Sequence, residues 1–167
     1  MIVYQLSVYL HILGAMVWVG GMLFLSLVAV PVARRLPPPE RARLLDAIGR
    51  RFRVVGWSCV ALLIATGMIN SGYRGVTWGD LTSGAILDTT FGRLYCLKLS
   101  LVAAMLAITA LHDFVIGPRS TRALAETSAE AQPTTNRRMM RWLAVLALLL
   151  ALLVVAVASM LVRGLPW

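Results

Sequence analysis

The chain has 167 residues, of which 59% are hydrophobic and 14% are charged. An ordinary soluble domain carries about 25% charged residues, so this composition excludes a typical water-soluble fold. The formal net charge of +9 does not indicate nucleic-acid binding, because no stretch interleaves basic residues with aromatics on a soluble domain. The basic residues lie between long apolar runs, where anionic lipid headgroups are the expected partner.

Four apolar runs are long enough to cross a bilayer, which requires about 20 residues per helix. They cover residues 3–32, 54–72, 91–116 and 142–162. Each run is apolar around its whole circumference, unlike the amphipathic helix of a soluble protein. The first run lacks a basic segment before it and is longer than a signal-peptide core, so we expect a retained span. The sequence therefore predicts an all-α, integral membrane four-helix bundle that forms one domain over residues 1–167.

The arginines predict the orientation of this bundle. The first connection holds Arg34, Arg35, Arg41, Arg43, Arg50, Arg51 and Arg53, and the third holds Arg119, Arg122, Arg137, Arg138 and Arg141. The second connection has only Arg74 before Arg93 at the start of the next run. Because positive residues favour the cytoplasmic side, we expect connections one and three inside the cell and both termini outside. The corresponding location is the bacterial cytoplasmic membrane.

The three connections differ in character. Pro37, Pro38 and Pro39 end the first helix and can start another, so residues 40–53 form either a short helix on the headgroups or a solvated basic loop. Residues 73–90 form either a lid over the bundle mouth or a loop anchored at the interface by Trp78. Residues 120–136 are rich in Ala, Ser, Thr and Glu, which predicts a mobile segment.

Ionisable residues inside the predicted spans are few, and such groups are usually functional because burying them in lipid is costly. They are His11, Lys98 and the pair His112 and Asp113. His11 and Lys98 each lie about 8 residues from the outer end of their helix, a depth of roughly 12 Å. His112 follows Lys98 by about 14 residues, or roughly 21 Å along the axis. A single metal ion therefore cannot be held by both histidines.

Helical spacing places Gly14, Trp18 and Met22 on the face of the first helix that carries His11. A glycine one turn from a histidine leaves space for a flat macrocycle, although close helix packing is the commoner use of small residues in membranes. The simpler roles are a hydrogen bond to a neighbouring helix for His11 and contact with the outer interface for Lys98. We favour a functional role for this pair, and a structural role for His112 with Asp113.

Three segments carry a family resemblance: residues 10–24, 50–70 and 91–112. Their motifs are His11 followed by Trp18, Gly20 and Gly21; Thr66 with Gly67; and Phe91, Gly92, Arg93, Leu94 and Lys98. With these motifs the chain resembles the CopD domain, named for bacterial copper-resistance protein D, and more distantly the HemJ group of membrane protoporphyrinogen oxidases. The resemblance is weakest in the fourth helix.

The resemblance to HemJ-like proteins implies haem b, with functional residues at positions that match His11 and Lys98. Our leading hypothesis is a haem b protein for electron transport or a small oxidoreductase reaction. His11 is then an axial ligand, and Lys98 is the opposite ligand or a cation beside a haem propionate. Further candidates are Arg93 for a second propionate and Gly14, Trp18, Thr66 and Asn70 for the lining of the site. A second, inner haem would use His112 and Met22.

The resemblance to CopD implies copper instead. In that alternative His11 acts with Met16, Met22, Met68 or Met105, because thioethers suit Cu(I). The chain lacks the additional helices and the Met/His-rich outer segment of larger CopD proteins. A third possibility is a cofactor-free accessory subunit of a larger membrane complex. Expected partners are the lipid bilayer and either a membrane redox protein or further copies of this chain.

Overall fold

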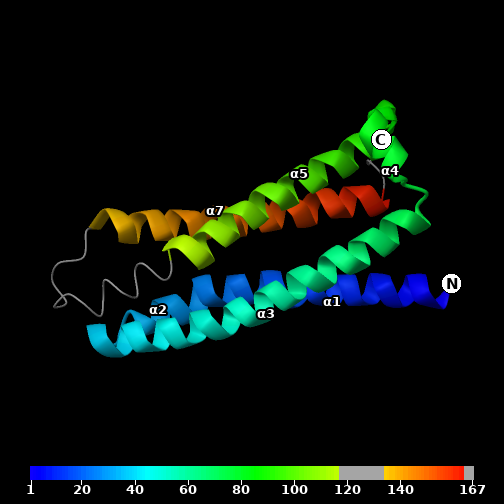
Figure 1. Ribbon diagram of the computed structural model, residues 1–167. Coiled ribbons are helices and arrows are strands. Elements are labelled where there is room, and N and C mark those ends of the chain that lie inside the picture. Colours follow the sequence, from blue (N-terminus) through cyan, green and yellow to red (C-terminus); the bar gives the residue numbers. More distant parts are fainter. Residues whose placement is uncertain (117–133, 164–167) are drawn as a thin grey trace.

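The computed structural model describes residues 1–116 and 134–163 (Figure 1). In chain order its elements are α1 (Ile2–Phe24), the π-helical η1 (Leu25–Ala29), α2 (Val30–Ala33), α3 (Pro38–Tyr73), α4 (Trp78–Ser83), the 3-10 helix η2 (Ala85–Asp88), α5 (Thr90–Ala110), the π-helical η3 (Leu111–Ile116) and α7 (Thr134–Arg163). The described part of the chain contains no strand. The prediction of an all-α protein is confirmed.

Four helical segments are long and apolar enough to cross a membrane. They are Ile2–Ala33, Pro38–Tyr73, Thr90–Phe114 and Trp142–Val162, and their mean hydropathy lies between 1.8 and 3.1. Large apolar side chains such as Leu27, Leu149 and Val162 lie on the outside of the bundle, where a soluble protein would present polar groups. The chain is a multi-pass membrane protein whose exterior faces lipid.

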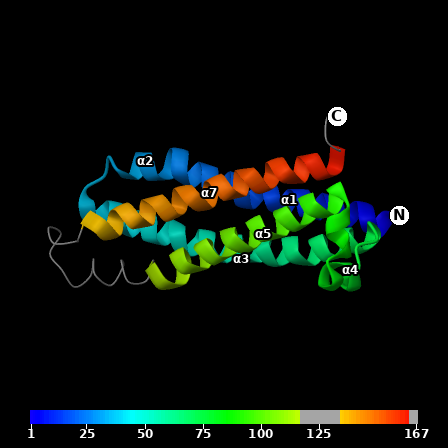
Figure 2. The same ribbon diagram turned by 90° about the horizontal axis from the view of Figure 1, so that it is seen from above.

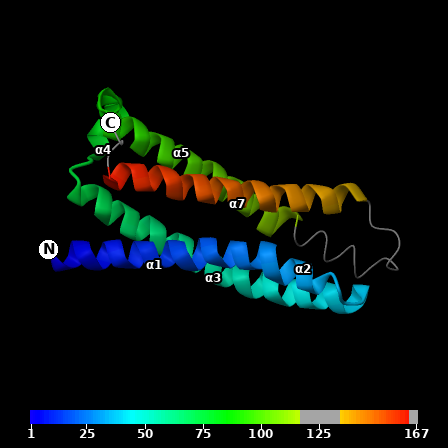
Figure 3. The same ribbon diagram turned by 180° about the vertical axis from the view of Figure 1, so that it is seen from behind.

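The bundle is built from two helix pairs, α1 with α3 and α5 with α7. The three ribbon views agree on this arrangement, with the blue and cyan pair beside the green and orange pair (Figures 1, 2 and 3). The start of α1 and the end of α7 lie at the same end of the bundle, as four crossings require. The connection between α2 and α3 and the start of α7 lie at the opposite end.

The centre of the bundle is a layer to which each spanning helix contributes one buried residue: Trp18 from α1, Val60 from α3, Met105 from α5 and Ala151 from α7. Trp18 is 5% exposed and lies against Gly56, where an added Cβ would be 3.4 Å from its Nε1 atom. Small residues thus let the helices approach closely. The layer separates the half of the bundle that contains the start of α1, which we name the outer half, from the half that contains the start of α3, which we name the inner half.

Residues 38–53 differ from both sequence-based alternatives. The prolines do start a helix, with Pro37 as its N-cap and Glu40 in its first turn, but this helix continues without a break into the second span. A helix of 36 residues is about 54 Å long, roughly 24 Å more than the hydrocarbon core. Arg50 and Asp46 form an ion pair one turn apart on the added length. The apolar run begins at residue 54, where the helix enters the hydrocarbon, whereas the helix itself begins at Pro38.

The second connection is folded rather than a plain loop. Thr77 and Asp80 form a capping box at the start of α4, which satisfies free backbone donors reciprocally. Gly84 ends α4 at φ +77°, a conformation that favours glycine. Trp78 is 73% exposed, as an interfacial anchor would be, while the role of this segment as a lid stays a prediction. Most of the third connection, predicted to be mobile, lies outside the described residues.

Candidate functional site

A chain of hydrogen bonds between α1 and α3 selects one tautomer of the neutral His11 ring. Its Nδ1 lies 2.8 Å from Thr66 Oγ1, and Thr66 Oγ1 lies 2.6 Å from the carbonyl oxygen of Leu62. A carbonyl only accepts, so the single hydroxyl proton of Thr66 is donated to Leu62. Thr66 must then accept from His11 Nδ1–H. The neutral imidazole is left with the lone pair of Nε2 uncommitted, the form in which histidine binds metals.

The surroundings of this chain are tightly packed. Thr66 and Ser7 are each 4% exposed, and Ser7 Oγ donates to the carbonyl of Thr66 over 3.2 Å. A Cβ on Gly67 would lie 3.5 Å from His11 Cε1, so the ring packs directly on α3. The position of the imidazole is therefore determined by both helices.

One cation of the outer half acts on this histidine, and a second cation acts on the first. The charge of Lys98 on α5 is within electrostatic reach of His11, and that of Arg74 is within reach of Lys98. Neither cation has a carboxylate within salt-bridge distance among residues 1–116 and 134–163. Asn70 Oδ1 is also buried there without a hydrogen-bond partner. Arg93 is exposed. The structure thus brings His11 and Thr66 into contact and places the charge of Lys98 within electrostatic reach of His11; their shared role as a site stays a prediction.

Gly14 and Trp18 occupy other positions than the haem hypothesis needs. An added Cβ at Gly14 would lie 3.3 Å from Leu62 and 3.5 Å from Leu63. These side chains fill the space that we assigned to a flat macrocycle, so Gly14 serves helix packing. Trp18 lies about two helical turns beyond His11, in the central layer.

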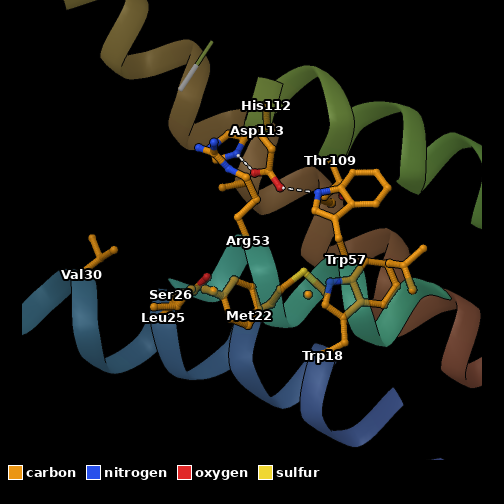
Figure 4. Close-up of a pocket in the computed structure, with 15 residues that line it drawn as sticks. Trp18, Met22, Leu25, Ser26, Val30, Arg53, Trp57, Thr109, His112 and Asp113 are labelled. Carbon is orange, nitrogen blue, oxygen red and sulfur yellow. Dashed lines mark hydrogen bonds and ion pairs between the residues drawn. The ribbon is translucent and has the colours of Figure 1, made fainter. Parts of the chain in front are cut away.

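A cavity of about 240 Å³ lies in the inner half of the bundle. Its lining includes Trp18, Met22, Leu25, Ser26, Arg53, Trp57, Thr109, His112 and Asp113 (Figure 4). His112 Nδ1 lies 3.0 Å from Asp113 Oδ1, and Trp57 Nε1 donates to Asp113 Oδ2 over 3.2 Å. A carboxylate accepts from both donors. His112 is thus held by a hydrogen bond on Nδ1, as His11 is.

Comparison with known proteins relates most of the chain, without its first spanning helix, to one family. The model of the family described as copper resistance protein D, CopD, matches residues 46–161. The chain belongs to the CopD family. It is also similar to a protein of Aquifex aeolicus (strain VF5) named only as an uncharacterized protein, with 29% identity over 152 residues and 90% of each chain covered. No solved structure matches.

The CopD match begins at residue 46, so it includes Thr66, Lys98, His112 and Asp113 but not His11. The match also includes most of the fourth helix, the part of the chain in which the sequence resemblance is weakest. The resemblance to HemJ-like proteins stays a prediction.

The methionines proposed as copper ligands lie in different places in this CopD chain. Met16 and Met68 are 66% and 58% exposed and face away from the bundle interior, whereas Met105 is 2% exposed in the central layer. Met22 alone of these four lines the inner cavity. No group of three or more His, Cys, Asp or Glu side chains with metal-binding geometry occurs in the described part of the chain. A metal held here needs ligands of another kind.

Sequence reasoning missed the links that hold the two histidines. The bond from Trp57 to Asp113 joins residues 56 positions apart in the chain, and the bond from His11 to Thr66 joins residues 55 apart. No local sequence pattern indicates either hydrogen bond. A possible signal was the placement of Thr66 and Asp113, polar residues that a lipid-facing helix position would not favour.

Proposed function

We propose that this CopD chain is a copper-handling protein of the bacterial cytoplasmic membrane that binds copper ions as cargo inside its helix bundle. One observation carries the proposal. Both histidines of the chain are bonded through Nδ1 to an oxygen acceptor, one in each half of the bundle. That arrangement is typical of metal-binding histidines, whose second nitrogen is left free for the metal.

Cu(I) is the form of copper that suits these surroundings. Neutral imidazole and thioether groups are the soft ligands that it accepts. The ion carries one charge, and the cost of bringing an ion into a low-dielectric interior grows with the square of its charge. A membrane bundle with neutral ligands therefore admits Cu(I) more easily than a divalent metal. The family match supports the same metal.

Haem b at His11 is the second candidate. The charge of Lys98 within electrostatic reach of His11 favours it, since haem propionates need positive partners. The packing of Leu62 and Leu63 on Gly14 opposes it, because it leaves no flat space beside His11 on that face. The residues on this face of His11 therefore do not fit a haem.

The decisive experiment compares metal content and absorption of the purified protein in nanodiscs. We expect Cu(I) binding, measured against a chromophoric competitor, and no Soret band. His11→Ala should lose one equivalent of copper, whereas Ile12→Ala, next to it on the exposed side of α1, should not. A Soret band that disappears in His11→Ala would replace copper by haem. A protein that binds neither, but purifies with other membrane proteins, would be an accessory subunit.

The orientation belongs to the same proposal: both termini outside, and the arginine-rich end in the cytoplasm beside anionic headgroups. Single cysteines placed at the exposed positions Arg43 and Thr82 report on opposite ends of the bundle. In a background without Cys59 and Cys96, an impermeant thiol reagent added outside should label position 82 only. Labelling of position 43 from outside would overturn the assignment.

A further inference from the structure

We propose a second Cu(I) site in the inner cavity, formed by Met22 Sδ and His112 Nε2, with Asp113 and Trp57 as positioning residues for the imidazole. The inference rests on the proposed copper function and adds to it a ligand set that is separate from His11. On α3, Thr66 beside His11 and Trp57 beside Asp113 are nine residues apart (66 − 57), or about 13.5 Å along the helix. The central layer lies between them.

The cavity brings a thioether and an imidazole to one space. Met22 extends from α1 and His112 comes from the end of α5, and they face this space from opposite sides (Figure 4). Because Asp113 Oδ1 accepts a hydrogen bond from His112 Nδ1–H, the Nε2 atom of the neutral ring has a lone pair. A nitrogen and a sulfur donor suit Cu(I), which accepts few, soft ligands. They do not suit Mg²⁺ or Ca²⁺, which require oxygen ligands.

Both π-helical segments of the structure border this cavity. Leu25 and Ser26 of η1 line one side, and His112 and Asp113 of η3 line the other. A π-helix has i to i+5 hydrogen bonds and is rare, and it occurs most often at functional sites. Its wider turn also reduces the angle between successive side chains. Adjacent residues such as His112 and Asp113 can then both face the cavity, which in an α-helix they would do less readily.

Two polar atoms at the cavity, Thr109 Oγ1 and Arg53 Nε, are buried without a hydrogen-bond partner among the residues that the structure describes. The Arg53 N–H only donates, so a bound Cu(I) does not satisfy it. The formal charges of Arg53 and Asp113 cancel in the lining. A bound Cu(I) therefore adds one positive charge, and the carboxylate of Asp113 opposes that charge through the imidazole.

The hydrogen bond from Trp57 determines which oxygen of Asp113 is available to His112. The indole N–H of Trp57 only donates and occupies one oxygen of Asp113, which leaves the other for His112. In Asp113→Asn, the single amide oxygen must serve Trp57, so the amide NH₂ faces His112 Nδ1. The imidazole then shifts its proton to Nε2, the nitrogen that binds the metal. An isosteric change thus removes the lone pair without emptying the cavity.

The first test is the stoichiometry of Cu(I) in the full-length protein in nanodiscs. We expect two equivalents in the wild type and one each in Met22→Leu and His112→Ala, with loss of copper–sulfur scattering from the inner site. The exposed Met16→Leu is the matched control and should keep two. If the wild type binds one equivalent that only His11→Ala removes, the inner site is wrong and the proposed function survives. If the wild type binds none, both fail.

The second test separates positioning from simple structural support. Asp113→Asn should weaken Cu(I) at the inner site about 10- to 100-fold, and Trp57→Phe added to it should restore part of the affinity by letting the amide turn. In metal-free protein, ¹⁵N NMR should find His112 protonated at Nδ1 in the wild type and at Nε2 in Asp113→Asn. The same tautomer in both proteins, or unchanged affinity in Asp113→Asn, would overturn the assignment even if copper binds.

Discussion

Two adjacent glycines of α1 offer a sharp test of the packing around the inner cavity. A Cβ added at Gly21 would lie 2.9 Å from Cζ and 3.3 Å from Cδ2 of the Phe52 ring, and closer still to Cε2, whereas a Cβ at Gly20 meets nothing within 4 Å. Phe52 is packed against the central layer and lines the cavity. The ring cannot stay where it is once Gly21 carries a methyl group.

The expected penalty follows from this contact. Overpacking a well-filled interior costs about 1–3 kcal/mol, while the gain in helix propensity from Gly to Ala is the same at both positions, about 1 kcal/mol at most. Gly21→Ala should therefore be about 1–3 kcal/mol less stable than Gly20→Ala. Because Phe52 lines the cavity, we also expect weaker Cu(I) binding at Met22 and His112, with the copper at His11 unaffected.

The assay is reversible unfolding in mixed micelles with increasing SDS, with helicity as the signal. Phe52→Leu provides the second arm of a double-mutant cycle, since a smaller side chain makes room for the methyl group. In that background the difference between Ala at position 21 and Ala at position 20 should largely vanish. Equal stability of the two single variants, or a penalty that persists with Leu at position 52, would refute the contact.

Three further outcomes are expected. Thr66→Val should weaken copper at His11 about 10- to 100-fold while Thr66→Ser does not, as measured by competition titration; equal affinities would contradict the hydrogen-bond chain. Gly92→Ala should destabilise the start of α5, because its Cβ would lie 2.6 Å from the backbone carbon of Ile86; protease digestion of the outer connection reports this. The hydroxyl and amide of the α4 N-cap lower the pKa of Asp80, so the cap should be fully formed above the usual pKa of an aspartate and be lost as the pH falls through the lowered value. Hydrogen exchange between pH 2 and 6 should show this loss, and Asp80→Asn should abolish the pH dependence.

The membrane-spanning helices were predictable because the lipid interior requires an apolar composition. A helix in hydrocarbon must satisfy its backbone internally and be apolar over about 20 residues, and the runs at 3–32 and 91–116 correspond closely to the helical segments found. The same reasoning failed at residues 38–53, which continue α3 outside the bilayer. Water accepts a helix and a loop equally well there, and the arginine-rich pattern alone does not separate them.

The candidate site was predictable in depth but not in contact. Counting residues placed His11 and Lys98 at one level, because rise per residue is a property of the backbone. What each side chain touches depends on how α1 and α3 cross, and this made Thr66 the partner of His11 while Gly14 became a packing position. The role of Asp113 was judged structural because a helix end tolerates polar groups. The structure adds that Asp113 lines a cavity and bonds Trp57 and His112, contacts that the sequence did not predict.

The central layer separates the two proposed copper positions. Trp18 and Met105 are 5% and 2% exposed and close the bundle between His11 and His112. An ion that reaches the outer imidazole has no wide passage through close-packed side chains of this kind, so in this conformation the layer separates the two positions. Met105 is the one soft donor in that layer. Any transfer between the halves would therefore require Trp18 to move and would pass the thioether of Met105, which makes this layer, rather than either histidine, the barrier that a copper-carrying bundle would have to control.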